Sequence, residues 1–529
     1  MDHGPAAARL ASGAEPLLIA EMPVNEVSTA GSSPPFILSA TPAGMGARFL
    51  ELRVTQSAHH GLQVAGIPER DAREVATRAT AALHPLRGLV PRLDLTVTVS
   101  PSVTPSFPGA LDLPVALACL RHLGALPPSS LDGWLAVGEL SLAGAVHSTR
   151  GLLAIAEAAL AAGSRKLMVP AHMAAEATIV PGLQVAPVSS LSEAVELLTK
   201  PEQLHPLSSA PPASEPQALD FADIPGREDV KTGLAVAAAG GHAVLLRGPC
   251  GSGKTKLARR FTGLLPSLSR PEAVETTKLY SYSGLLMEGS GCCPNGPSAA
   301  PHHTVSAAGL AGGGVLCRPG EASLAHNGVL FLDELPEFRR ATLDPLSIPL
   351  EHGQIQLSRP GLDVTFVARF HLLAAMNRCP CGNAGNPPAA GQRCRCTPEA
   401  IRGYHHRIPP FLAQRFDITL DVPPPPRRED CPPPAPTIDF RARVESARKR
   451  QAHRYAGLQH VTQNGQLSAP LVSKFCSLSR SEVAGVRVRA PAAADDVQQP
   501  VDAVAHVDGL GRQVDADRFR KQQHGGLSD

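Results

Sequence analysis

Residues Gly248 to Thr255 form a glycine-rich segment whose composition suits the binding of a phosphate chain. The segment follows the apolar run AVLLR and precedes KLARRF, so we expect a strand, a tight turn and the start of a helix. Backbone N–H groups of such a turn surround phosphate oxygens, while its lysine reaches the β- and γ-phosphates and its threonine hydroxyl binds Mg²⁺. The predicted ATP-binding residues are Gly248, Pro249, Cys250, Gly251, Ser252, Gly253, Lys254 and Thr255. The alternative is an ordinary glycine-rich connection, and the strand and helix flanks argue against it.

A second apolar run, GVLFL, is followed directly by Asp333 and Glu334. In nucleotide hydrolases an acid at the end of such a strand holds Mg²⁺, and the next acid orients or deprotonates the attacking water. An acidic pair after an apolar run is by itself common on protein surfaces. Together with the segment at 248–255, however, it predicts that ATP is hydrolysed and not only bound.

Two more polar residues lie next to apolar strands and suit the same reaction. Asn377 ends FHLLAAMN, where it can position the attacking water, or it is simply an asparagine that ends a strand. Arg415 stands just before FDITLDV, where it can act as an arginine finger on a neighbouring copy or form a surface salt bridge. Arg407 is a second candidate for the finger.

Four cysteines occur as two Cys-x-Cys pairs: Cys379 with Cys381, and Cys394 with Cys396. Four thiolates can complete a tetrahedral Zn²⁺ site, although structural zinc sites usually have two or more residues inside each pair. Zinc and four unliganded thiols are therefore the two alternatives.

Two other groups of basic or titratable residues have an ordinary and a functional interpretation. His302 and His303 precede the glycines at 312–314, and they are either hydrogen-bonded loop residues or part of an insertion that faces DNA. The basic helix predicted at Arg441–Tyr455 is most simply a solvated surface, and it can also contact phosphates.

The elements around these residues divide the chain into segments. Alternating strand and helix patterns run from residue 48 to 199, and a Pro- and Ser-rich stretch separates them from the region that carries the phosphate-binding residues. We predict an α/β protein with a disordered leader at 1–47, an α/β domain at 48–199, a linker at 200–219, a P-loop domain with a parallel sheet at 220–422, a partial helical domain at 423–478 and a divergent, disordered tail at 479–529.

The bulk composition limits location and partners. The formal charge is only +2, so any DNA contact must come from local patches. The 11 cysteines in 529 residues do not form a small disulfide scaffold and fit a reducing compartment. Neither a targeting segment nor an apolar run of about 18 residues is evident, so the expectation is a cytoplasmic protein that does not enter a membrane.

At these positions the sequence resembles the magnesium-chelatase-like AAA+ ATPases of the ComM/YifB family. The matching strings include AAAGGHAVLLRGPCGSGKT, APHHTVSAAGLAGGG, PGEASLAHNGVLFLDELPEF, PLEHGQIQLSR and AAMNRCPCGN. The resemblance implies an AAA+ domain, a homo-oligomeric ring of six copies, and action on DNA during branch migration. A magnesium chelatase motor subunit and a nucleotide-binding remnant without coupled activity are the alternatives.

The first α/β domain is similar to the Lon-protease-like domain that precedes the ATPase domain in that family. The strings that carry this likeness are GLQVAGIPERDAREVATRATAAL, FPGALDLPVALACL and RGLLAIAEAALAAG. A working site of that type needs a serine nucleophile and a lysine, but the corresponding regions contain PGALD at 108–112 and RGLL at 150–153. The domain is therefore expected to be catalytically silent. Beyond LVSKFCSLS the chain departs from the family, so the helical lid is expected to be truncated or divergent.

Overall fold

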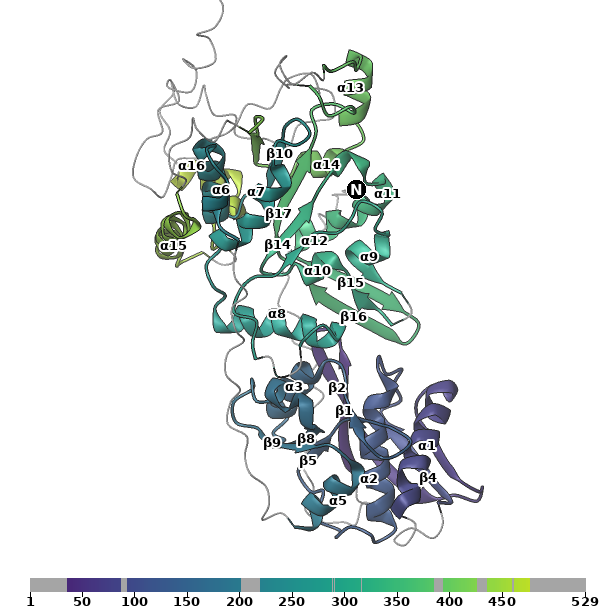
Figure 1. Cartoon of the computed structure of the whole chain (residues 1–529). Coiled ribbons are helices and arrows are strands. Elements are labelled where there is room, and N and C mark those ends of the chain that lie inside the picture. Colours follow the sequence, from purple (N-terminus) through teal and green to yellow (C-terminus); the bar gives the residue numbers. More distant parts are fainter. Residues whose placement is uncertain are drawn as a thin grey trace, which may run out of the picture.

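A seven-stranded sheet organises the N-terminal part of the chain and a five-stranded sheet organises the part that follows (Figure 1). The structure is a computed structural model. It describes residues 36–86, 93–200, 219–287, 289, 291–314, 316–384, 393–425, 435–458 and 461–475. The predicted α/β class is confirmed. The predicted linker at 200–219 lies almost wholly outside the described residues, and so does the predicted tail at 479–529.

The N-terminal sheet is mixed, because β1 pairs antiparallel with β2 and β2 pairs antiparallel with β4, whereas the other neighbours are parallel. Its strands, in sheet order, are β3 (Leu62–Ala65), β4 (Leu95–Ser100), β2 (Gly46–Gln56), β1 (Ile37–Ala43), β5 (Trp134–Ala136), β8 (Lys166–Pro170) and β9 (Gln184–Val188). A short hairpin, β6 (Glu139–Leu140) with β7 (Val146–His147), lies outside this sheet.

Five α-helices accompany this sheet in the described residues: α1 (Glu69–Leu83), α2 (Asp112–His122), α3 (Leu152–Ala161), α4 (Ala174–Ala177) and α5 (Leu191–Thr199). The spacing of apolar residues explains α1, because Ala72, Val75, Ala79 and Ala82 recur at helical intervals and are buried. Helix α2 is buried along nearly its whole length, in keeping with its nearly continuous apolar sequence.

The predicted end of the leader at residue 47 is wrong, because the first strand of the sheet already lies within 1–47. Residues Ile37–Ala43 form β1, which lies between β2 and β5 inside the sheet, and residues 1–35 lie outside the described part of the chain. The sequence ILSATPA has small residues and no clear alternation, because β1 is buried on both faces and needs no polar side. Pairing with β2 over seven residue pairs fixes it as a strand.

The second sheet is parallel and has the order β11 (Ser298–Ala299), β14 (Val329–Leu332), β17 (His371–Met376), β10 (Val244–Arg247), β18 (Ile418–Asp421). The central strands are nearly continuous apolar runs, as expected for a sheet covered on both faces. Two hairpins are added, β12 (Gly312–Gly313) with β13 (Arg318–Pro319) and β15 (Gln354–Arg359) with β16 (Leu362–Val367).

The helices around this sheet vary from single turns to long helices. In the described residues they are α6 (Glu228–Gly240), α7 (Lys254–Phe261), α8 (Arg270–Ser283), α9 (Ala307–Ala311), α10 (Glu321–Leu324), α11 (Arg340–Leu343), α12 (Ser347–His352), α13 (Pro398–His405) and α14 (Pro410–Ala413). Ser269 and Glu272 form a capping box that begins α8. None of the described helices combines the length and hydropathy needed to cross a membrane.

Helix α8 of the second module packs against the N-terminal module, and Figure 1 shows it lying across their boundary. Tyr282 near its end is buried and makes edge-to-face contacts with Phe107 of the N-terminal module and Phe366 of β16, at centroid distances of 5.3 and 5.1 Å. The Tyr282 hydroxyl donates to Ser106 Oγ at 3.2 Å. Lys278 also pairs with Glu157 of α3 at 2.6 Å. The modules are therefore joined by an apolar contact with polar partners and not by the linker alone.

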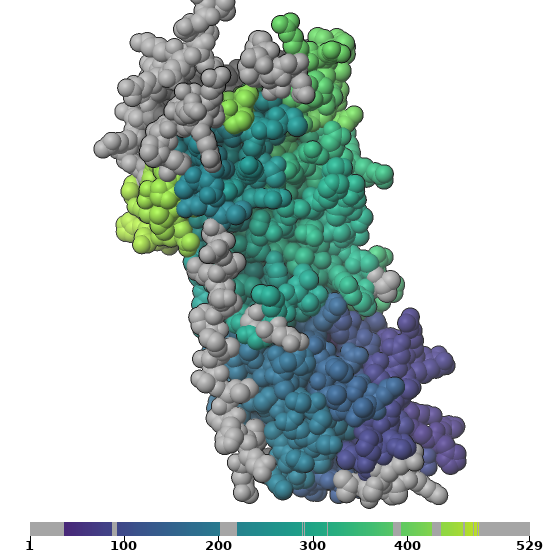
Figure 2. All heavy atoms as spheres, in the orientation of Figure 1, coloured from purple at the N-terminus to yellow at the C-terminus, as the bar shows by residue number. Residues whose placement is uncertain are grey.

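The basic segment predicted at Arg441–Tyr455 belongs to α15 (Thr437–Arg454), which lies beside α6 (Figures 1 and 2). It is not solvated on every side. The Arg448 guanidinium donates to the Ala238 carbonyl oxygen at 2.7 Å, and burial lowers its pKa to about 10. A further helix, α16 (Ala469–Phe475), follows.

Candidate nucleotide-binding site

The glycine-rich segment lies between the end of β10 and the start of α7, at the carboxyl edge of the parallel sheet. Strand β17 is in register with β10, with Met376 opposite Arg247, and β14 follows as the next strand. Since the carboxyl ends of parallel strands share one edge, Asp333 after β14 and Asn377 after β17 both lie near this segment. The topology thus brings together residues from three separate parts of the sequence.

The turn requires glycine at particular positions. Gly251 and Gly253 have φ of +74° and +85°, which is the left-handed region. At Gly248 a Cβ atom would lie 2.2 Å from the carbonyl oxygen of Val422. The backbone of this segment, referred to below as the P-loop, therefore follows a path that side chains at these positions would obstruct.

The ammonium group of Lys254 is held inside the P-loop. Its Nζ atom donates to the carbonyl oxygens of Gly248 and Pro249 at 3.0 and 2.8 Å, and to Asn377 Oδ1 at 3.0 Å. Burial lowers the pKa of this lysine, with nearby Cys250, Asp333 and Glu334 opposing that shift. The contact with Asn377 joins the strand tip of β17 to the P-loop.

Thr255 and Asp333 lie in direct contact, since the threonine hydroxyl donates to Asp333 Oδ2 at 2.7 Å. A hydroxyl and a carboxylate oxygen at this separation are the hard oxygen ligands that Mg²⁺ prefers. The donor set therefore fits the predicted ion, which Thr255 and Asp333 would hold.

Glu334 has a backbone conformation that is rare for residues other than glycine, with φ +53° and ψ +46°. Such conformations cost roughly 1–3 kcal/mol and concentrate at functional sites. Its N–H donates to Asp333 Oδ1 at 3.0 Å, and its Oε2 lies 3.5 Å from His303 Nδ1. The sequence predicted His303 either in a hydrogen-bonded loop or in an insertion that faces DNA, and nothing in its spacing indicated this contact with the acid.

The two arginine candidates have different surroundings. Arg415 is exposed and precedes β18, whose first residue, Ile418, is paired with Val244 at the start of β10. Arg415 therefore lies toward the sheet edge opposite the P-loop of its own chain. Arg407 forms an ion pair with Glu337 at 3.2 Å and its guanidinium lies 5.9 Å from the Tyr404 ring centroid.

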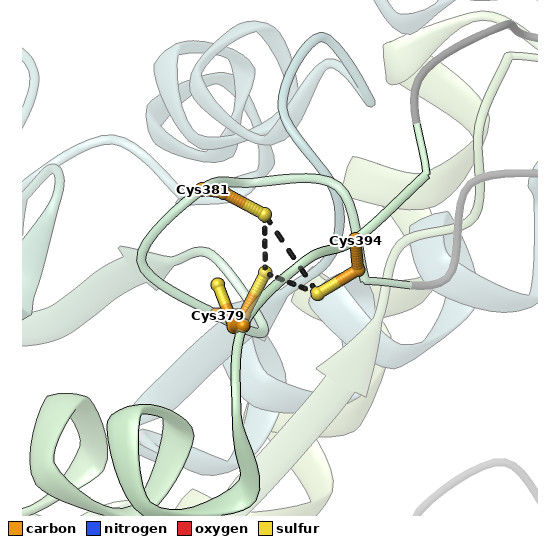
Figure 3. Close-up of side chains that lie close together, drawn as sticks. Cys379, Cys381 and Cys394 are labelled. Atoms are coloured by element: carbon orange, nitrogen blue, oxygen red, sulfur yellow. Dashed lines mark hydrogen bonds between the residues drawn. The ribbon is translucent and has the colours of Figure 1, made fainter.

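All four cysteines of the two Cys-x-Cys pairs come together. The sulfur atoms of Cys379, Cys381, Cys394 and Cys396 lie within 4.8 Å of one another, and Figure 3 shows three of them converging. The cluster follows β17 directly, so it lies beside the P-loop. Separately, His302 forms a hydrogen bond through Nδ1 with Thr304 Oγ1 at 2.9 Å.

The N-terminal module contains no Ser–Lys contact at the positions expected for a Lon-type site, among the residues described. Ser106 is buried and accepts its hydrogen bond from Tyr282, and Lys166 lies with Nζ 5.6 Å from the Trp134 ring centroid. A cavity of about 640 Å³ lies between this module and α8, lined by residues that include Glu157, Ile179, Arg270, Lys278 and Arg369. No P-loop residue lines it.

Comparison with known proteins covers both modules. The sequence profile of the family described as "Magnesium chelatase, subunit ChlI" matches residues 220–430, and the profile described as "Subunit ChlI of Mg-chelatase" matches residues 50–173. The chain is 37% identical to the uncharacterized protein YifB of Escherichia coli over 426 residues, which is 80% of this chain and 82% of that protein. It is 39% identical to competence protein ComM of Haemophilus influenzae over 372 residues, 69% of this chain and 71% of that protein. An uncharacterized protein of Mycobacterium bovis, Mb2921c, is 37% identical over 363 residues, 68% of this chain and 71% of that protein.

Proposed function

We propose that this chain, which belongs to the magnesium-chelatase-like ComM/YifB family, hydrolyses ATP in a ring of identical copies and uses the energy to remodel DNA. The observation that carries the proposal is the meeting of three strand ends at one site. Lys254 contacts Asn377, and Thr255 contacts Asp333. Binding residues and candidate hydrolytic residues therefore share one sheet edge.

Each residue has a distinct part in the proposed reaction. The P-loop amides and Lys254 bind the phosphates and neutralise their charge, and Thr255 with Asp333 holds Mg²⁺, which supplies positive charge to the phosphate oxygens when bound. Glu334 accepts a proton from the attacking water. Asn377 orients that water, because its amide lies beside the Lys254 ammonium group.

A ring of copies accounts for the position of Arg415. This exposed arginine lies toward the sheet edge away from its own P-loop, so its natural target is the γ-phosphate bound by a neighbouring copy. We take six copies as the ring size, following the resemblance of the sequence to ring-forming AAA+ ATPases. Cofactors in this proposal are ATP and Mg²⁺, with Zn²⁺ at the four cysteines, and the protein works in the cytoplasm.

DNA is the proposed partner, and branch migration during recombination and natural transformation is the proposed process. One relative carries the name competence protein. The exposed side of α15 offers a local cationic surface despite the small net charge, and its residues are Arg443, Lys449, Arg450 and Arg454. Such a surface suits contacts with phosphates that weaken as salt concentration rises.

The test is the rate of phosphate release with and without branched or single-stranded DNA. We expect DNA to increase turnover and Lys254→Ala to abolish it. Lys256→Ala is the matched control, since Lys256 is exposed on the same helix. ATP binding without phosphate release would instead identify a nucleotide-binding remnant, and turnover indifferent to DNA at low salt would remove the basis for a DNA motor.

The second candidate is a magnesium chelatase motor subunit, which the descriptions of both matching profiles favour. Copurification with porphyrin-binding partners would support it over DNA remodelling. In either case we propose a structural role for the N-terminal module and no protease activity, because Ser106 is covered by Tyr282 and lacks a lysine partner among the described contacts. Incubation with unfolded protein substrates is expected to yield no cleavage.

A further inference from the structure

The sulfur atoms of the four cysteines are arranged like the ligands of a single metal ion. The Sγ atoms of Cys379 and Cys381 are 3.4 Å apart, those of Cys381 and Cys394 are 3.7 Å apart, and those of Cys394 and Cys379 are 3.6 Å apart (Figure 3). A tetrahedron with Zn–S bonds of about 2.3 Å has S···S edges of about 3.8 Å. A disulfide would bring two sulfurs to about 2.05 Å. These three separations, with Cys396 Sγ within 4.8 Å of the other sulfurs, fit four thiolates around one ion, and none of the three is short enough for a disulfide.

The surroundings of Cys379 also suit a metal ligand. Its side chain is buried, and its Sγ accepts a hydrogen bond from the Ala384 N–H at 3.3 Å. Hydrogen bonds from the backbone to a ligating atom orient it and tune its electron density. Cys381 is exposed and Cys394 and Cys396 are partly exposed, so an ion can reach the site from solvent.

The cysteine cluster contacts the P-loop directly. The N–H of Cys250 donates to the Gly382 carbonyl oxygen at 2.8 Å, so this amide of the P-loop is already used by the cysteine-bearing loop. Gly382 has φ +76°, and a Cβ atom there would lie 3.0 Å from Cys250 Cβ. Asn377, which accepts from Lys254, lies two residues before Cys379 in the sequence. The segment 377–384 thus touches the P-loop at two separate points.

We infer that Zn²⁺ bound by the four thiolates holds segment 377–384 against the P-loop, so that loading with zinc sets the affinity for ATP. The inference rests on the proposed function of the P-loop. With the ion bound, the Gly382 carbonyl and the Asn377 amide are fixed where Cys250 and Lys254 meet them. Without it, the segment keeps the ion pair of Arg378 with Asp421 and the contact of the Arg378 carbonyl oxygen with His405, but its cysteine-bearing loop is no longer fixed, and both contacts with the P-loop are weakened.

The experiment combines metal content with ATP affinity in the full-length protein. We expect one zinc ion per chain by elemental analysis, and its release when a mercurial reagent titrates the thiols. Cys394→Ser with Cys396→Ser is expected to lose the zinc. Cys292→Ser with Cys293→Ser is the matched control, because these adjacent cysteines lie outside the cluster, and it is expected to retain zinc.

The expected loss of ATP affinity is about fivefold when zinc is removed, equivalent to one backbone hydrogen bond of roughly 1 kcal/mol. It is measured with a fluorescent ATP analogue on native protein, on chelator-treated protein, and after readdition of Zn²⁺, which is expected to restore the affinity. Gly382→Ala is a second variant that keeps all four thiols. It is expected to retain zinc and lose a similar factor of affinity, because a Cβ at this position crowds Cys250.

Three results would overturn the inference: protein purified with no zinc that fails to bind added Zn²⁺, protein purified with iron at this site, or loss of zinc with no change in ATP affinity. Lys254→Ala separates this inference from the proposed function, since that variant is expected to lose ATP binding while keeping its zinc. A chain that holds zinc and binds ATP in a zinc-dependent manner but never releases phosphate would refute the ATPase proposal and leave this inference standing.

Discussion

Glu176 gives the stability of the protein a specific dependence on pH. This residue of α4 is only 4% exposed, and it accepts hydrogen bonds from Leu153 N–H at 2.8 Å and from the Ser281 hydroxyl of α8. Burial raises its pKa from 4.5 to about 7, and the two hydrogen bonds oppose that shift. The folded protein therefore binds a proton at pH values where the unfolded chain has already released it.

The direction and magnitude of the pH effect on the free energy of unfolding follow from this difference between the folded and unfolded pKa of Glu176. The stabilisation by the protonated carboxyl is fully present below the unfolded pKa of 4.5 and is lost as pH rises toward the folded pKa of about 7. Between pH 5 and pH 8 the loss is about 2.5 kcal/mol in the free energy of unfolding, at 1.36 kcal/mol per pKa unit. Glu176→Gln keeps the shape of the side chain but has no charge to bury, so this part of the pH dependence is expected to disappear.

Urea unfolding monitored by tryptophan fluorescence provides the assay. Trp134 is the single tryptophan of the chain and is buried in β5, so its emission reports the N-terminal module that contains Glu176. The quantity compared is the change in unfolding free energy from pH 5 to pH 8, for the wild type, Glu176→Gln and the exposed control Glu196→Gln. If wild type and Glu176→Gln lose stability equally over this range, the carboxyl is ionised in the folded protein and the reasoning is wrong.

Three other changes test the contacts described above. Tyr282→Phe removes the hydrogen bond to Ser106 and is expected to cost about 1 kcal/mol, whereas Tyr282→Ala removes the aromatic contacts as well and is expected to cost about 4 kcal/mol in the same urea assay. Glu334→Gln is expected to bind a fluorescent ATP analogue normally while phosphate release falls at least about 100-fold, and equal turnover would exclude Glu334 as the base. Arg415→Ala is expected to abolish turnover alone and to regain part of it when mixed with Glu334→Gln chains, because each copy then supplies the group that its neighbour lacks. Absence of rescue in rings shown to be mixed would argue against a finger acting between copies.

Much of the candidate nucleotide site was predictable because its residue types are consecutive in the chain. The P-loop has glycines, a lysine and a threonine at fixed spacing, and Asp333 and Glu334 directly follow an apolar strand. The helix α1 likewise follows from local spacing, since its buried residues recur at helical intervals. Each of these features depends on neighbours within a few residues, which the sequence displays directly.

Tertiary structure decided the features that depend on distant pairing. Strand β1 has no alternating pattern, and only its position between β2 and β5 makes it a strand. Spacing on α15 could not tell which arginine faces α6, yet Arg448 is half-buried there and donates to the Ala238 carbonyl oxygen. Tyr282 and Ser106 meet across 176 residues.

The same division applies within the site. The sequence alone specifies a phosphate-binding turn, an acidic pair and four cysteines. It leaves open whether these cysteines bind zinc or remain unliganded thiols. The structure brings the four sulfur atoms together and places Gly382 against Cys250, and it sets His303 beside Glu334. The physical reason is that chain connectivity determines local conformation, whereas contacts between distant segments depend on how the strands and helices pack around a shared core.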